Sequence, residues 1–164
     1  MKYSFIGIDP GANGGIAMIT VEHTWYAERF PIDKDPAKAK DIFDTMVLES
    51  RNEGFLVKTY IERVHAMPTD GRSSAFKFGV NYGMWLGITA NSEVHLVTPQ
   101  MWQKHYGQLP KEKKEKKNHL KEMAINLAQN QCKTTLATAD AILIANYGKE
   151  TYANNDWRPN KCWR

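Results

Sequence analysis

Three short segments typical of β-strands precede the first segment typical of a helix, and this order constrains the fold more than any other feature. The segments 3–9, 14–21 and 25–32 are rich in β-branched and aromatic residues, and the run PGANGG joins the first two. A glycine-rich run of this kind predicts a tight turn, so the first two segments should pair as a hairpin. The third is expected to add a further antiparallel strand.

Helix and strand patterns alternate through the rest of the chain. Apolar residues three and four apart predict helices, whereas apolar residues at every second position predict strands. The order predicts an α/β fold with a mixed five-stranded sheet flanked by helices. The expected helices are 36–50, 74–90, 111–129 and 138–147, the expected strands are 55–64 and 94–98, residues 99–110 form a connection, and an irregular tail begins at about residue 153.

The expected helix 74–90 carries Gly79, Gly83 and Gly87, which are spaced by four residues and therefore share one face. Glycine costs about 1 kcal/mol inside a helix, so three on one stripe indicate the close approach of another backbone. Two interpretations follow. The stripe packs against the protein's own sheet, or it meets a second subunit.

Length and composition fit a single domain spanning residues 1–164, because 42% hydrophobic and 24% charged residues are ordinary for a globular protein. No apolar run is long enough to cross a membrane, and the first residues do not have the pattern of a secretion signal. We therefore expect a cytoplasmic protein. Cys132 and Cys162 have no C-x-x-C spacing, so neither a zinc site nor a disulfide framework is predicted.

Positive charge is concentrated in one part of the chain. The net charge is +4, and residues 104–121 contain seven lysines against two glutamates. Taken singly, each lysine is typical of a solvated helix face, but the cluster favours contact with phosphates. The lysines are Lys104, Lys111, Lys113, Lys114, Lys116, Lys117 and Lys121.

Three acids interrupt segments that are otherwise apolar. Asp9 ends the first strand segment, Glu62 lies in the segment 55–64, and Asp140 lies at the start of the last helix segment. A carboxylate in a buried element is costly unless it is paired, hydrogen-bonded or bound to a cation. Asp9 could instead cap its turn, and Glu62 could form an ion pair with Arg63 or with a lysine. If the three acids adjoin, they form an oxygen-rich site that suits Mg²⁺ or Mn²⁺.

Four segments together resemble the successive motifs of RuvC-type Holliday junction resolvases. GIDPG alone also resembles the phosphate loop of sugar kinases and actin-like ATPases, but those folds need a second such domain. The four segments follow the family's order across most of the chain. They are GIDPGANGG at 7–15, IERV at 61–64, TPQMWQKHYG at 98–107 followed by KKNHLKEMA, and ADAILIANYG at 139–148.

The resemblance implies a ribonuclease H-like fold and an endodeoxyribonuclease that resolves four-way junctions and other branched DNA, leaving 5′-phosphate and 3′-hydroxyl ends. It also implies a homodimer, two Mg²⁺ ions that Mn²⁺ can replace, no small-molecule cofactor and no membrane. Asp9, Glu62 and Asp140 match the metal-binding acids, and Lys117 matches a basic position near them. The short chain is similar to phage forms, which act in the host cytoplasm.

The resemblance also predicts a DNA-binding surface. Residues 65–77 resemble the loop that contacts the junction, and Phe76 there could stack on an opened base or lie in the core. Trp102 stands near where the family has a basic residue, close to Lys104. We interpret Trp102 and Tyr106 as packing residues. The predicted DNA contacts are Arg72, Phe76, Lys77, Lys104, Lys113, Lys114, Lys116 and Lys117.

One expected acid is missing. The family has it three or four residues before the position of Asp140, where this chain has Ala137 and Leu136. Three explanations are open: natural use of three acids, natural loss of activity, or an engineered alanine. The alternative to a nuclease is therefore a catalytically silent protein that binds DNA junctions.

Overall fold

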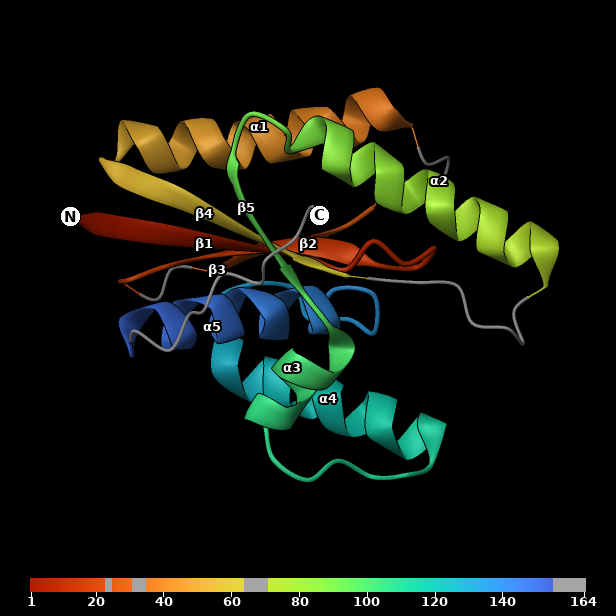
Figure 1. Ribbon diagram of the computed structural model, residues 1–164. Helices are drawn as coiled ribbons and strands as arrows, with labels where there is room; N and C mark the ends of the chain where they lie inside the picture. The colour runs from red at the N-terminus through yellow and green to blue at the C-terminus, as the bar shows by residue number, and fades with distance from the viewer. Residues whose placement is uncertain (23–24, 31–34, 64–70, 155–164) are drawn as a thin grey trace.

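A computed structural model describes residues 1–22, 25–30, 35–63 and 71–154. Its described part contains five strands and five helices (Figure 1). The strands are β1 (Lys2–Ile8), β2 (Gly15–Thr20), β3 (Trp25–Arg29), β4 (Phe55–Glu62) and β5 (Glu93–Val97). The helices are α1 (Pro36–Asn52), α2 (Arg72–Ile88), α3 (Pro99–His105), α4 (Lys113–Ala128) and α5 (Ala139–Ala153).

The strands form one mixed sheet in the order β3-β2-β1-β4-β5. The first three are antiparallel neighbours, and the sheet continues from β1 through β4 to β5 with parallel pairing. The parallel connections run through helices, as such crossovers require. The predicted α/β class and the mixed five-stranded sheet are both confirmed.

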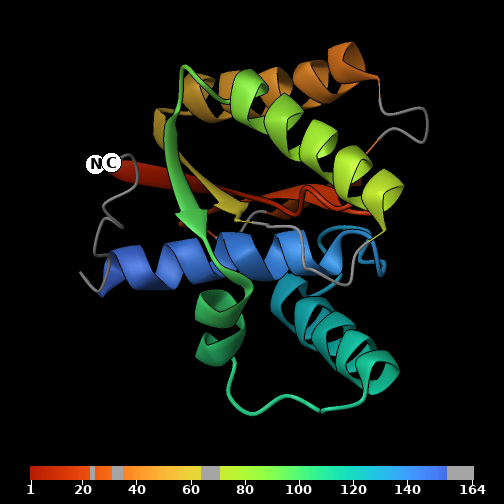
Figure 2. The same cartoon turned by 45° about the vertical axis from the view of Figure 1, so that its right-hand side comes forward.

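The helices cover the two faces of the sheet differently. Helices α1 and α2 lie on one face, and α5 lies on the other, with α3 and α4 packed against it (Figures 1 and 2). Each face has its own buried cluster, one centred on α5 and one on α1 and Trp85. A Cβ atom on Gly7 would stand 2.2 Å from the Ala141 carbonyl oxygen and 2.4 Å from the Ala145 nitrogen. Only glycine on β1 therefore lets α5 approach the sheet so closely.

Two elements differ from the sequence predictions. Residues 99–110 were expected as a plain connection, but they contain α3, because Thr98 caps it through a hydrogen bond from the Met101 N–H and Pro99 starts its first turn. Helix α5 continues to Ala153 rather than ending at residue 147. The expected tail lies outside the described residues from 155 onward, as do residues 64–70 of the expected junction loop.

The glycine stripe of α2 does not pack against the sheet. Among the described residues, no atom would lie within 4 Å of a Cβ added at Gly79, Gly83 or Gly87. Only Asn81 and Trp85 of this helix are buried. The interpretation that the stripe packs on the protein's own sheet is therefore wrong, and the described part of the chain leaves this face open. None of the described helices could span a membrane.

Candidate active site

The parallel register of β1 and β4 brings two of the three acids to the same edge of the sheet. Ile8 pairs with Ile61, so Asp9 and Glu62 follow at neighbouring strand ends. The Gly11 N–H donates to Asp9 Oδ1 at 2.9 Å, and the Asp9 N–H donates to the Gly15 carbonyl at 3.0 Å. The expected turn therefore exists, and Asp9 both shapes it and faces the site beyond it.

The third acid arrives on the helix that crosses the sheet. Asp140 lies in the first turn of α5, where the helix dipole favours a negative charge. The preceding loop is fixed by Thr138, whose Oγ1 accepts a 2.9 Å hydrogen bond from the Thr135 N–H. The polar contacts of this loop therefore set where α5 begins, and with it the place of Asp140.

Asp9 and Asp140 line a cavity of about 1030 Å³. Its walls come from the turn at residues 11–14, from residues 27–30 around β3, from Lys117 and Lys133, and from residues 135–139. Glu62 is not one of the lining residues. Arg29 and Lys133 do line the cavity, and no motif in the sequence had singled them out.

Electrostatic coupling ties the three acids together. Burial raises the pKa of Glu62 to about 7, with a further contribution from the charge of Asp9 and a smaller one from Asp140. Burial and Asp9 likewise raise the pKa of Asp140 to about 7, against the lowering effects of Lys117 and Lys116. Burial also raises the pKa of Asp9, opposed by the Gly11 N–H and Lys117. Burial, with the repulsion among the acids, therefore outweighs the effect of the nearby lysines on the pKa values of these carboxyls.

Asp9, Glu62 and Asp140 fit Mg²⁺ or Mn²⁺ in chemistry, because they offer neighbouring carboxylate oxygens whose negative charges a cation would neutralise. Across the described ranges, no three carboxylate, histidine or cysteine side chains stand ready as ligands to one ion. Asp9 instead interacts with Glu62 and with Asp140. Mg²⁺ commonly binds one or two carboxylates and completes its shell with water and substrate phosphate. The residues are therefore suitable, but they do not form a preformed cage.

Ala137 occupies a position inside the site. It lines the same cavity as Asp9 and Asp140, and its side chain is half-buried. The neighbouring Leu136 also lines the cavity and is 56% exposed. An acid at position 137 would therefore add a carboxylate to this cavity.

Trp102 contacts the site, which sequence analysis missed. It is fully buried, as a packing residue should be, and its indole N–H donates to Glu62 Oε1 at 2.8 Å. The two residues are 40 positions apart in sequence. The unexpected helix α3 brings them together, so no local pattern could have shown the contact.

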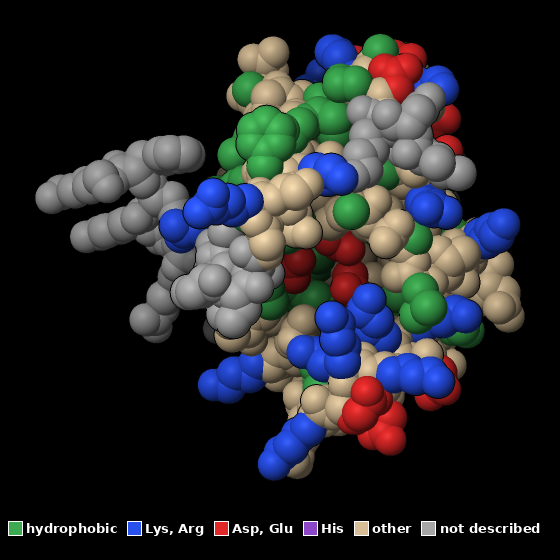
Figure 3. Space-filling view, turned by 90° about the vertical axis from the view of Figure 1, so that its right-hand side faces the viewer, with side chains coloured by type: hydrophobic (Ala, Val, Ile, Leu, Met, Phe, Trp, Pro, Cys, Tyr) green, Lys and Arg blue, Asp and Glu red, His purple; other side chains and the backbone are tan. Residues whose placement is uncertain are grey.

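The predicted basic surface borders the acids. Figure 3 shows acidic side chains in a hollow, with a group of Lys and Arg side chains along its rim. Lys117 lines the cavity, and Lys116 donates to Gln103 Oε1 at 2.6 Å. The side chains of Lys104, Lys113 and Lys114 are exposed.

The described part of the predicted junction segment begins α2. Arg72, Phe76 and Lys77 lie in its first turns and are exposed. Phe76 is 73% exposed, so the alternative that it belongs to the core is wrong. The aromatic ring is free to contact a ligand.

The sheet order and helix placement define a ribonuclease H-like fold. The chain is similar to two solved structures of Thermus thermophilus RuvC. RuvC in complex with Holliday junction substrate superposes with a TM-score of 0.61 at 16% identity, over 96% of this chain and 99% of that one. Another RuvC structure gives a TM-score of 0.56 at 16% identity with the same coverage. No family model and no curated protein matches the chain. The RuvC resemblance in the sequence is thus confirmed for the fold.

Proposed function

We propose that this chain is a metal-dependent endodeoxyribonuclease that resolves four-way junctions and other branched DNA. The observation that carries the proposal is the electrostatic coupling of Asp9, Glu62 and Asp140 beside Lys117 on a RuvC-like fold. Three partly buried, mutually repelling carboxylates are costly to a folded chain, and a bound cation with a catalytic role accounts for them.

The residues divide the chemistry between them. Asp9 with Glu62, and Asp9 with Asp140, would hold the Mg²⁺ ions, which supply activation of water and stabilisation of the leaving 3′-oxygen. Lys117, which lines the cavity and lowers the pKa of Asp9 and of Asp140, would offset negative charge at the scissile phosphate. Water adds to phosphorus and the bond to the 3′-oxygen breaks, which gives 5′-phosphate and 3′-hydroxyl ends.

The surface around the acids suits DNA. The exposed lysines of α3 and α4 would contact backbone phosphates, so binding should weaken steeply with salt. At the start of α2, Phe76 would stack on an opened base while Arg72 and Lys77 contact the flanking phosphates. Phe76→Ala should therefore weaken junction binding by about 1–3 kcal/mol.

A homodimer completes the proposal, because two sites are needed to nick two opposing strands. The open glycine stripe of α2 is the surface we assign to a second copy of the chain. Val80 beside it is 54% exposed. Val80→Glu should shift the protein from dimer to monomer in analytical ultracentrifugation, whereas Leu48→Glu on α1, at a residue of 60% exposure, should not. A wild-type protein that is monomeric at all concentrations would refute this part.

The second candidate is a catalytically silent junction binder. It is favoured by Ala137, which lines the cavity where the family has an acid. The two candidates share the fold and the DNA-binding surface and differ only in hydrolysis.

The decisive experiment measures nicking of a labelled four-way junction and a matching linear duplex, with Mg²⁺, Mn²⁺ or EDTA. Metal-dependent cleavage that prefers the junction and is lost in Asp9→Asn would support the nuclease. Asp44→Asn is the matched control, because it makes the same chemical change at an exposed residue of α1. Activity that appears only in Ala137→Asp, or tight binding without cleavage by either form, would identify the silent binder. No preference for the junction in binding or cleavage would refute both.

A further inference from the structure

Glu62 accepts a hydrogen bond from a side chain in the segment that follows β5. Strand β5 pairs with β4 so that Val97 lies beside Glu62, and Thr98 then caps α3. Trp102 lies in the middle of this helix, with 0% exposure, and donates its indole N–H to Glu62 Oε1. The indole N–H is therefore held in a fixed position, because the Trp102 ring is packed on a short helix.

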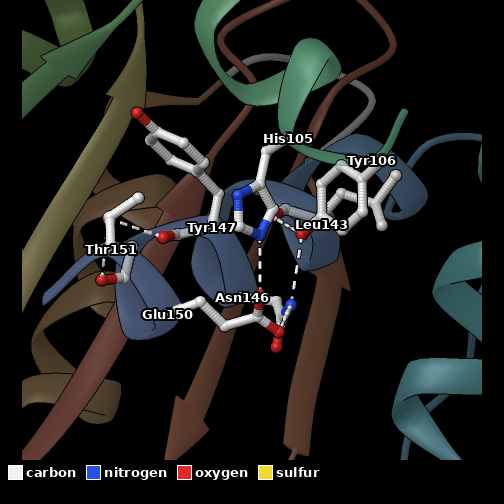
Figure 4. Close-up of polar contacts among 8 residues, drawn as sticks. His105, Tyr106, Leu143, Asn146, Tyr147, Glu150 and Thr151 are labelled. Carbon is white, nitrogen blue, oxygen red and sulfur yellow. Dashed lines mark hydrogen bonds and ion pairs between the residues drawn. The ribbon is translucent and has the colours of Figure 1, made fainter. Parts of the chain in front are cut away.

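Helix α3 is itself held on α5, the helix that carries Asp140. The Tyr106 hydroxyl donates to the Leu143 carbonyl at 2.6 Å and accepts from Asn146 Nδ2 at 3.3 Å (Figure 4). Beside it, His105 Nε2 lies 2.6 Å from Glu150 Oε2. These contacts hold α3, which carries Trp102, in a fixed position relative to α5, which carries Asp140.

An indole suits the task of orienting an acid that must keep its charge. Its N–H donates and cannot accept or ionise, so it fixes one carboxylate oxygen without neutralising the group, whereas a lysine would form an ion pair. The second oxygen of Glu62 remains available to a cation. Metal-binding carboxylates are commonly held by such supporting hydrogen bonds, whose loss weakens metal binding about 10–100-fold.

We propose that Trp102 is a positioning residue that fixes the carboxylate of Glu62 for cation binding, and that α3 acts as the arm that joins it to α5. The part concerning the cation rests on the function proposed above. The hydrogen bond itself does not, so the two can fail separately.

The chain provides a matched control in Trp85. This tryptophan is also fully buried, but its indole nitrogen has no hydrogen-bond partner among the described residues. It packs on the other face of the sheet, with its ring 4.6 Å from that of Phe30. Trp85→Phe and Trp102→Phe therefore remove equal volumes from the core, and only the second removes a donor from the site.

The first measurement follows the indole N–H resonances of ¹⁵N-labelled protein without metal. Glu62→Gln should move the Trp102 resonance and leave that of Trp85 in place, because only Trp102 donates to the altered group. The two tryptophan variants assign the peaks. If Trp102→Phe does not fold, contacts with the nearby Tyr106 ring, 6.4 Å away, assign the Trp102 resonance instead. An unmoved Trp102 resonance in Glu62→Gln would overturn the proposal.

The second measurement is the affinity for Mn²⁺ alone, by electron paramagnetic resonance in the absence of DNA. Trp102→Phe should bind Mn²⁺ at least about tenfold more weakly than wild type, and Trp85→Phe should bind it normally. On junction DNA, Trp102→Phe should lower kcat and leave KM nearly unchanged. Equal Mn²⁺ affinity in the two variants would overturn the proposal. If wild type binds no Mn²⁺ while Glu62→Gln still moves the indole resonance, the metal function fails and the hydrogen bond stands.

Discussion

The two faces of the sheet differ in how closely α5 and α2 pack against them. On one, α5 buries eight of its fifteen residues, and its backbone lies directly against β1 at Gly7. On the other, α2 buries two of seventeen, and its glycines have no close neighbour among the residues that the structure describes. The close-packed face carries Asp140 toward the site, and the loosely covered face carries Phe76 at its exposed end. Close packing thus accompanies the residues whose positions must be fixed, whereas the open face leaves room for a partner.

The largest test of this difference is Gly7→Val. Its side chain would overlap the backbone of α5, which cannot move without carrying Asp140 with it. We expect the free energy of unfolding to fall by about 3 kcal/mol or more, measured by urea denaturation. A variant with near-native stability would show that α5 can shift, and the contrast between the faces would be broken.

The pH dependence of stability tests the two acids Glu62 and Asp140. The pKa values of Glu62 and Asp140 are about 7 in the folded protein, above their ordinary values of 4.5 and 3.8. The folded chain thus keeps protons that the unfolded chain releases, so this contribution to stability is full at low pH and is lost as the pH rises to about 7. The slope is at most about 1.4 kcal/mol per pH unit for each group.

Urea denaturation in EDTA between pH 4.5 and 7.5 measures this slope. Asp140→Asn should flatten it, and Asp44→Asn on α1 should not. Added Mg²⁺ should restore stability at the upper end of the range if the site binds the ion. An equal slope in Asp140→Asn and wild type would contradict the assignment.

The smallest effect belongs to the open face. Gly83→Ala places a methyl group where no atom of the described residues lies within 4 Å, and alanine favours the helix. We expect a gain of about 0.5–1 kcal/mol in the monomer. If the stripe is a subunit contact, the same substitution should weaken the dimer, so stability and dimer affinity should change in opposite directions.

Much of the fold could be predicted because its signals are local. Alternation, helical periodicity and the glycine turn identified every strand and four of the five helices. The acids Asp9, Glu62 and Asp140 could be singled out because each interrupts an apolar segment. Their electrostatic coupling follows from the sheet register and the crossing of α5.

What could not be predicted depends on tertiary contacts. Helix α3 is short and begins at a capping threonine and a proline, so its sequence is equally typical of a connection. The bond from Trp102 to Glu62 exists only after α3 folds. The exposure of Phe76 and of the α2 glycines depends on which elements pack against α2. A local sequence pattern does not give this information.

The pairing of β1 with β4 has a consequence for how such a site persists. Neighbouring strands stand about 4.8 Å apart, and residues that follow paired positions inherit that spacing from the peptide backbone. The distance between the backbones at Asp9 and Glu62 is therefore set by main-chain hydrogen bonds, which nearly any sequence can make. A chain can replace almost all its side chains around such a pair and keep the interval, which is how 16% identity can coexist with a shared architecture over 96% of this chain.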